Sequence, residues 1–369
     1  MTIPLLDLAA QHAVIRPELD AAIDGVITSS AFISGPYVSA FNREFAAYCG
    51  AQHAIGVSNG THAISLALKG FGIGRGDEVI TVPQTFIATA EAISAVGATV
   101  RFVDVEPRTV TMDHDALASA ITARTKAIIP VHLYGQSADM RAIGTIAKAH
   151  GLKVLGDAAQ AHGATFDGEP IARWADATSF SFYPGKNLGA FGDAGAVVTD
   201  DAALAKFVAM ASDHGRTSKY AHDFEGENCR MDGMQAAILS VKLRHLESWT
   251  ERRRALAATY TGLLADVPGL TLPYERPGSR AVFHLYVVRT ARRDALREHL
   301  QRQGISTGVH YPIPLHRQQA YAYLGLGDGS FPESERVSRD AVSLPLFPEM
   351  TTAQQERVVT EVAGFMRSA

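Results

Sequence analysis

Two polar side chains stand at the ends of short apolar segments in the middle of the chain. Lys186 follows the segment 177–182, and Asp157 follows the earlier segment 153–156. This pattern is typical of buried strands that deliver side chains to the rim of a sheet. An amine and a carboxylate on neighbouring strands suit a pyridoxal phosphate (PLP) enzyme, in which the lysine forms a Schiff base and the carboxylate keeps the pyridine nitrogen protonated. Neither residue is diagnostic alone, because most lysines near strand ends are solvated surface residues.

A candidate phosphate site lies much earlier in the chain. Gly60 and Thr61 stand where one predicted strand ends and a helix begins. The N-terminus of a helix offers free backbone N–H groups and the positive end of its dipole to a phosphate. Gly60 would let the backbone approach closely, Thr61 would add a hydroxyl donor, and Ser181 could add another from the strand before Lys186. An ordinary capped turn explains the first two residues equally well.

Two further residues have types that suit a planar cofactor. Phe86 follows the second predicted strand, where an aromatic ring could stack on the cofactor ring or simply pack in the core. Gln160, which follows Asp157 closely, could donate to a phenolate oxygen or lie on the surface.

Two loops near the predicted domain junction are also candidates. His310 and Tyr311 begin a loop with two prolines and three polar aromatic residues, a composition that favours a binding loop over a plain connection. Asn228 and Arg230 lie in a polar loop just before a long helical segment, where a capping role is the simplest alternative.

A rival interpretation from another class rests on Ser58. The segment 56–60 matches the Gly-x-Ser-x-Gly turn that carries the nucleophile of α/β-hydrolases. That serine normally follows several strands, whereas one predicted strand precedes Ser58. A hydrolase also needs an Asp or Glu and then a His as triad partners. His162 and His214 are available, but nothing in the sequence marks either of them as a base. The hydrolase is therefore a remote alternative.

The elements around these residues alternate between strand and helix from about residue 53 to 200. This pattern predicts an α/β fold with a mostly parallel sheet, which binds ligands at the carboxyl ends of its strands. One long helix is predicted over 231–265, followed by a smaller α+β region. We expect an N-terminal arm and large PLP-binding domain at 1–250 and a small C-terminal domain at 251–369. The predicted strands are 53–58, 78–82, 100–105, 127–133, 153–156, 177–182, 194–199 and 284–289, and the predicted helices are 19–27, 61–71, 86–96, 140–149, 294–303 and 352–366.

Composition excludes several classes of function. The 369 residues are 47% hydrophobic, as in an ordinary globular protein. The net charge is −4 and there is no block of like charges, which argues against nucleic-acid binding. Two cysteines are too few for an iron–sulfur cluster or a cysteine-rich zinc site, so no metal is expected. Neither a signal peptide nor an apolar run long enough to span a membrane is visible, so we expect a cytoplasmic protein that does not associate with membranes.

Taken together, these segments resemble the DegT/DnrJ family of PLP-dependent sugar aminotransferases, which have the fold of aspartate aminotransferase (fold type I). The resemblance runs nearly end to end and is carried by residues 3–8, 34–36, 76–79, 130–135, 157–163, 182–189 and 311–316. Two positions depart from the family pattern. Gly156 stands where the family usually has Glu, and 226–230 replaces the usual Gly-Tyr-Asn-Tyr-Arg.

The resemblance implies a role for each candidate. Lys186 is similar to the Schiff-base lysine and general base, and Asp157 to the partner of the pyridine nitrogen. Asn228 is similar to an asparagine that reaches the cofactor phosphate of the neighbouring subunit, which implies a homodimer with shared active sites. The remaining implied cofactor contacts are Gln160 near the phenolic oxygen, Phe86 on the ring, and Gly60, Thr61 and Ser181 at the phosphate.

The implied function is transfer of an amino group from an amino acid, with L-glutamate as the expected donor, to a nucleotide-linked keto-sugar. Lysine rather than histidine at position 186 favours transamination over the dehydration that some family members perform. Residues 213–216, 219–220 and 310–311 look most like members that aminate C3 of a dTDP-3-keto-6-deoxyhexose in deoxyamino-sugar biosynthesis, for lipopolysaccharide or an antibiotic. A 4-keto-sugar aminotransferase, an aminocyclitol aminotransferase and a PLP-binding regulatory protein stay open. The expected sugar contacts are Tyr183, Arg230, His310 and Tyr311.

Overall fold

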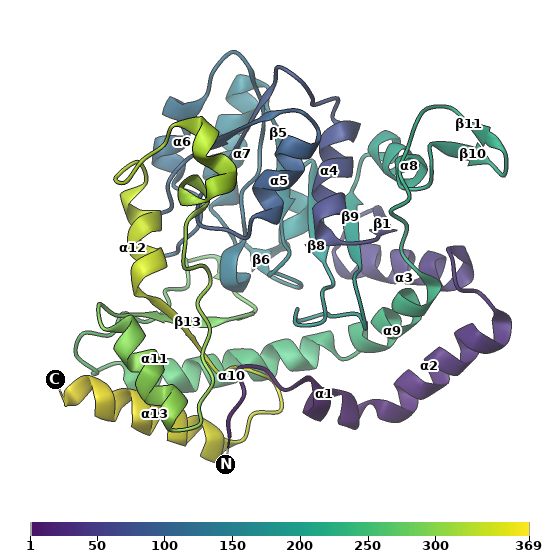
Figure 1. The fold of residues 1–369 in the computed structure, drawn as a ribbon. Coiled ribbons are helices and arrows are strands. Elements are labelled where there is room, and N and C mark those ends of the chain that lie inside the picture. Colours follow the sequence, from purple (N-terminus) through teal and green to yellow (C-terminus); the bar gives the residue numbers. More distant parts are fainter. Residues whose placement is uncertain (1, 369) are drawn as a thin grey trace.

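The computed structural model describes residues 2–368, and its centre is a seven-stranded sheet (Figure 1). The strands run in the order β1-β9-β8-β5-β4-β2-β3. β9 is antiparallel to both of its neighbours, and the other pairs are parallel, so the predicted mostly parallel α/β fold is confirmed. The strands are β1 (His53–Val57), β2 (Glu78–Thr81), β3 (Thr99–Phe102), β4 (Thr125–Ile128), β5 (Lys153–Asp157), β8 (Ala177–Ser181) and β9 (Gly195–Thr199).

Both faces of this sheet are covered by helices, because successive residues of each strand point to opposite sides. Val197 belongs to one apolar cluster and Val198 to the other. The cluster that contains Val198 includes residues of α3 (Gly35–Tyr48), α6 (His114–Ala120) and α7 (Met140–His150). The cluster that contains Val197 includes residues of α4 (Gly60–Gly70), α5 (Ala88–Ala95) and α8 (Ala202–Ala211).

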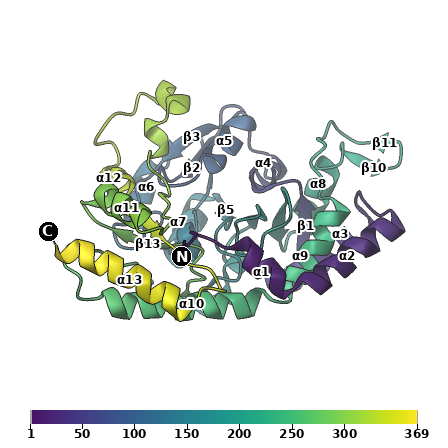
Figure 2. The same cartoon turned by 60° about the horizontal axis from the view of Figure 1, so that its bottom comes forward.

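The helix predicted over 231–265 is in fact two helices, so that prediction was wrong. α9 (Gly233–Leu243) packs on α3 and on α2 (Arg16–Ser29), whereas α10 (Leu246–Leu264) packs on α13 (Thr352–Arg367). At the break, Arg244 and His245 both bind Glu18 of α2, and the His245 ring stacks on Trp249. α9 and α10 therefore pack on different helices, and Figure 2 shows α10 running beside α13.

The C-terminal region has an apolar cluster of its own. β13 (Tyr286–Arg289) pairs antiparallel with β14 (Ala341–Leu344), and α11 (Arg293–Arg302) packs on α13. Apart from Ile3, which the N-terminal arm contributes, the buried members of this cluster lie between 256 and 366. Other residues of this region, among them Val282 and Val337, belong to the cluster on one face of the large sheet, so the two regions also pack on each other. The division near residue 250 stays a proposal, and that position falls within α10.

The remaining elements are short. The hairpin of β10 and β11 projects away from the sheet (Figure 1). Within residues 2–368, no helix combines the length and apolar character that crossing a membrane requires. These elements are α1 (Leu8–Val14), β6 (Thr165–Phe166), β7 (Glu169–Pro170), β10 (Arg216–Ser218), β11 (Ala221–His222), β12 (Ser279–Arg280), α12 (Pro332–Asp340) and the 3-10 helices Leu133–Gly135, Ile171–Trp174, Leu315–Arg317 and Gln319–Leu324.

The aromatic cluster under β8 predicts a large stability effect. Phe45 is fully buried, and its ring packs against Phe180 at 5.0 Å and Phe182 at 5.1 Å between ring centroids. Phe45→Ala should lower the free energy of unfolding by about 3–5 kcal/mol, because it removes buried area and leaves a cavity. Urea denaturation at one protein concentration measures this. Leu263→Ala, at an exposed position of α10, should leave the free energy of unfolding nearly unchanged. Equal losses in both variants would contradict the assigned core.

Candidate active site

The ends of β5 and β8 bring Asp157 and Lys186 to the same edge of the sheet. The two strands are parallel neighbours, with Asp157 beside Ser179. After β8 the chain turns at once, because the Lys186 N–H donates to the Tyr183 carbonyl at 2.8 Å. The carboxyl ends of parallel strands share one edge, so the predicted pair is brought together.

Both side chains line one cavity of about 590 Å³. This volume lies in the usual range for a small-molecule site. Ten of the twelve residues predicted from the sequence line it. They are Gly60, Thr61, Phe86, Asp157, Gln160, Ser181, Tyr183, Lys186, His310 and Tyr311.

Asp157 is a buried acid at the wall of the cavity, with 5% of its surface exposed. Its Oδ2 accepts from the Thr89 hydroxyl at 2.7 Å, and its Oδ1 accepts from the Ala159 N–H at 3.1 Å. Burial nevertheless raises its pKa, although these two donors and the charge of Lys186 oppose the rise. Within residues 2–368 this carboxylate forms no ion pair, so it is prepared for a cationic N–H from a ligand.

Lys186 is an amine with an unusually low affinity for protons. Burial lowers its pKa to about 8, and the nearby Asp157 carboxylate only partly offsets this. A substantial fraction of the amine is therefore neutral near physiological pH. A neutral amine is the form that attacks an aldehyde or accepts a proton, and buried lysines are used for this purpose in catalysis.

The start of α4 opens into the same cavity. Asn59 caps this helix by accepting the His62 N–H at 2.8 Å, which leaves the Gly60 and Thr61 N–H groups without helical partners. Gly60 is required by close packing, because a Cβ there would lie 2.7 Å from the Ser181 Cβ. The helix start and Ser181 therefore face the cavity together, as a phosphate cradle requires.

Aromatic and amide groups line another part of the cavity. The Phe86 and Tyr311 rings are 5.7 Å apart, and the Tyr311 hydroxyl accepts from Gln160 Nε2 at 3.1 Å. Gln160 is fixed from behind, because its Oε1 accepts from the Tyr134 N–H at 2.7 Å. The Tyr134 hydroxyl donates to the His310 carbonyl at 2.5 Å, which ties the 310–311 loop to the 3-10 helix Leu133–Gly135. One N–H of Gln160 is left for a ligand.

Asn228 and Arg230 do not line the cavity of their own chain. Both lie beside Asp213: Asn228 pairs with it through the backbone, and Arg230 Nη1 donates to its Oδ1 at 2.6 Å. The guanidinium of Arg230 is thus already used. The expected contact of Asn228 with a neighbouring subunit and that of Arg230 with substrate stay predictions.

Among the cavity residues that sequence reasoning missed, three polar ones stand out. Thr89, on α5, orients the Asp157 carboxylate. His284 and Arg253 come from the C-terminal half, and Arg253 is held by the Leu346 carbonyl at 2.8 Å. Burial lowers the pKa of Arg253 to about 10, and burial together with the charge of Lys186 holds the pKa of His284 far below its usual range. No local motif marks residues that arrive from such distant segments.

The geometry around Ser58 does not support the hydrolase alternative. Ser58 Oγ and His62 Nδ1 lie 2.7 Å apart, but the nearest oxygen of Glu227 is 3.9 Å from His62 Nε2 and that carboxylate binds Lys69. The strand before the serine, β1, is at the edge of the sheet, and Ser58 does not line the large cavity. A nucleophile needs an oriented base and space for substrate.

Comparison with protein families decides between these interpretations. The DegT/DnrJ/EryC1/StrS aminotransferase family model matches residues 14–363. The chain belongs to this family. It is an aminotransferase of fold type I, as the sequence predicted.

Relatives of this aminotransferase match it along almost its whole length. A dTDP-3-amino-3,4,6-trideoxy-alpha-D-glucose transaminase from Streptomyces venezuelae is 49% identical over 98% of this chain and 95% of its own. A "pleiotropic regulatory protein" from Geobacillus stearothermophilus is 48% identical over 100% of this chain and 99% of its own. The crystal structure of S. venezuelae DesV in complex with a ketimine intermediate superposes with a TM-score of 0.97 at 47% identity, covering 99% of this chain and 98% of DesV.

The cavity of this aminotransferase fits pyridoxal phosphate. A related structure, NtdA from Bacillus subtilis, contains the cofactor as PMP and matches with a TM-score of 0.93 at 33% identity, covering 99% of this chain and 85% of NtdA. The PLP or PMP cofactor is thus confirmed for the family. In this chain, a buried carboxylate, a lysine of lowered pKa and an open helix N-terminus meet in one cavity, as PLP requires.

The lowered pKa of Lys186 predicts a pH profile in the cofactor-free protein. Acetic anhydride labels only neutral amines, so labelling of Lys186 should rise with pH and reach half its maximum near pH 8, well below the midpoint of an ordinary lysine. Asp157→Asn should move the midpoint lower still, because the carboxylate raises the lysine pKa. Mass spectrometry of the Lys186 peptide measures this. A midpoint as high as that of an exposed lysine would refute the assigned environment.

Proposed function

We propose that this enzyme uses PLP to move an amino group from L-glutamate to a nucleotide-linked keto-sugar. The observation that carries the proposal is the meeting of Lys186 and Asp157 in one cavity at adjacent strand ends. We further propose C3 of a dTDP-3-keto-6-deoxyhexose as the acceptor. The names of the Streptomyces relative and of a 45% identical dTDP-3-amino-3,6-dideoxy-alpha-D-galactopyranose transaminase from Aneurinibacillus thermoaerophilus support this acceptor.

Each part of the site would contribute a separate physical effect. When bound, PLP supplies an electron sink beside the transferred amino group. Lys186 would hold the cofactor and move a proton at Nζ, since a pKa near 8 suits both acceptance and return of a proton. Asp157, oriented by Thr89, would accept the ring N–H. The start of α4 and Ser181 would hold the phosphate.

The part of the cavity near Tyr183 and His310 would bind the sugar. Tyr183 is 59% exposed at the rim, and Phe86 is 55% exposed, so both have surface to offer a ligand. His310 has a pKa lowered by burial to about 4, so it would act as a neutral hydrogen-bonding group rather than a cation. Aromatic hydroxyls and imidazoles suit the hydroxyl groups of a sugar ring.

We also propose that the enzyme works as a homodimer with shared active sites. Exposed apolar side chains gather on the N-terminal helices and the segment after them, which is typical of an interface. The hairpin that leads toward Asn228 projects away from the sheet, with Tyr220 84% exposed at its turn. The exposed apolar residues are Val14, Ile27, Phe32 and Ile33. Free Cys49 and Cys229 support the cytoplasm as its location.

A panel of keto-sugars tests the acceptor. With glutamate and PLP, the enzyme should aminate dTDP-3-keto-6-deoxyhexoses more efficiently than dTDP-4-keto-sugars, UDP- and GDP-linked keto-sugars or keto-inositols, as read by mass spectrometry. Lys186→Ala should lower the rate by at least about 100- to 10,000-fold, whereas Ser58→Ala should keep it. Preference for a 4-keto-sugar or a cyclitol would replace the acceptor. Absence of turnover with every acceptor would favour a regulatory protein like the Geobacillus relative.

Subunit complementation tests the shared site. Lys186→Ala and Asn228→Ala should each lower the activity of the homodimer, the second by raising the Kd for PLP. Unfolding and refolding the two together should restore part of the activity, because one site of each mixed dimer keeps both native residues. Size-exclusion chromatography verifies dimer formation. If the mixture is no more active than its components, Asn228 serves its own subunit.

A further inference from the structure

A second cavity, of about 40 Å³, lies against the active site. It is large enough for a few water molecules or one small polar group. Leu133 and Leu285 line both cavities, so the two share a wall. The walls of the small cavity are mostly apolar and come from the segments around residues 108–110, 133–136 and 272–289.

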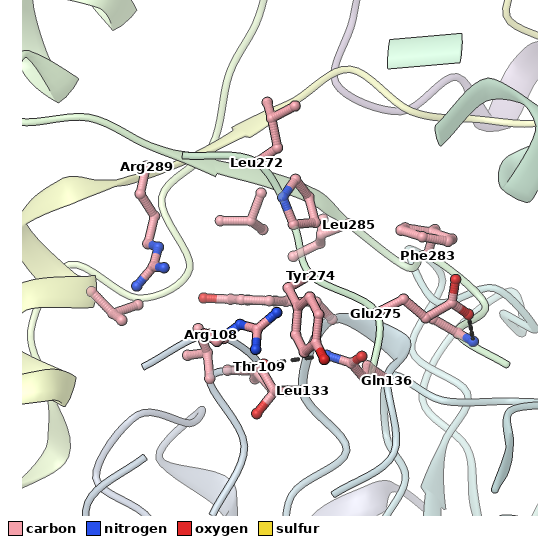
Figure 3. A pocket seen from close by; sticks show the side chains of 16 residues that line it. Arg108, Thr109, Leu133, Gln136, Leu272, Tyr274, Glu275, Phe283, Leu285 and Arg289 are labelled. Carbon is pink, nitrogen blue, oxygen red and sulfur yellow. Dashed lines mark hydrogen bonds between the residues drawn. The ribbon is translucent and has the colours of Figure 1, made fainter. Parts of the chain in front are cut away.

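Two arginine side chains, Arg108 and Arg289, approach this cavity from different segments (Figure 3). Arg108 is exposed and lies over the Tyr274 ring, with 3.5 Å from its Cζ to the ring centroid. Arg289 is half-buried on β13. Across residues 2–368, neither guanidinium forms an ion pair or a hydrogen bond. Because both guanidiniums line one cavity and have no acceptor within residues 2–368, their N–H groups are free to bind an anion there.

The acids nearby do not fill this role. Glu275 lines the cavity, but its Oε1 already accepts from Arg254 Nη1 at 2.9 Å and from the Ala281 N–H at 2.7 Å. Glu333 and Asp340 attract Arg289 only from a distance, and Glu333 is bound by Arg336. Burial and repulsion from Arg336 both lower the pKa of Arg289, and a bound anion would offset both effects.

We propose that this Arg108–Arg289 pocket binds a small anion, a carboxylate or a phosphate group, between its two guanidiniums. Arginine suits this task because its planar donors match both groups in pairs. The pocket is separate from the phosphate cradle at the start of α4. Tyr134, which lines the pocket, also holds Gln160 and the 310–311 loop. An occupant would therefore contact a residue that shapes the sugar side of the active site.

Inorganic phosphate is the probe, applied to the PLP-loaded enzyme so that the cofactor phosphate site is filled. At constant ionic strength, phosphate should raise the midpoint of thermal unfolding of the wild type and of Arg141→Gln, an exposed arginine elsewhere. Arg289→Gln and Arg108→Gln should each weaken the apparent affinity for phosphate by about 10- to 100-fold, the loss expected for a charged hydrogen bond. Arg108 is exposed, so its variant should fold even if Arg289→Gln does not.

Equal phosphate responses in all four proteins, or none in the wild type, would overturn the proposal.

If the thermal response is confirmed, steady-state kinetics distinguishes two sources of the anion. If the pocket binds a phosphate of the sugar substrate, Arg289→Gln should raise KM for the nucleotide-linked sugar and leave kcat unchanged. If it binds a free anion, the sugar KM without added phosphate should stay at the wild-type value while the thermal response is lost. The thermal response requires no turnover, so it stands even if the proposed acceptor is wrong.

Discussion

The buried carboxylate of Asp157 is the constraint on which the active site depends. An ionised acid in the interior is costly unless hydrogen bonds or a cation compensate it, and here two neutral donors compensate it only in part. Thr89 of α5 supplies one of these donors, so that helix is hydrogen-bonded to the end of β5. Within residues 2–368 Asp157 has no ion-pair partner, so we propose that a ligand supplies the cation. The same carboxylate keeps the pKa of Lys186 from falling further, so one group influences both halves of the chemistry.

The position of Lys186 is held from both sides of the molecule. Lys242 of α9 is buried and donates from Nζ to the Gly189 carbonyl at 2.6 Å, which anchors the turn after Lys186. The adjacent Asn187 donates to the Val282 carbonyl at 3.2 Å, and its Oδ1 lies 3.2 Å from His284 Nδ1. The turn is thus held between α9 and the segment around Val282. Rigid support of this kind is what a group that moves protons requires.

The sequence was most informative about polar residues that come directly after a strand. β5, β8 and the start of α4 each show an apolar run that ends in polar residues, and that local signal located Asp157, Ser181, Gly60 and Thr61 together with the lysine. Residues that reach the cavity from far along the chain, such as Arg253, carry no such signal, because tertiary packing alone places them. The break between α9 and α10 was missed for a related reason: the helical pattern is continuous, and the interruption arises where Glu18 of a distant helix binds both residues at the junction.

The departure from the family pattern at Gly156 affects the support of the sheet rather than the pocket. Because strand residues alternate, Gly156 faces away from Asp157 and does not line the cavity. A Cβ there would lie 3.1 Å from His132 Nε2 and 3.3 Å from Thr178 Oγ1, two buried atoms that have no partner within residues 2–368. Since His132 Nδ1 accepts the Ala138 N–H, its neutral ring carries a proton on Nε2. A glutamate at this position would require both side chains to shift. It would therefore change the packing on the face of β5 that points away from the cavity. We therefore propose that sugar selectivity depends on residues that line the cavity, such as Tyr183 and His310, rather than on this substitution.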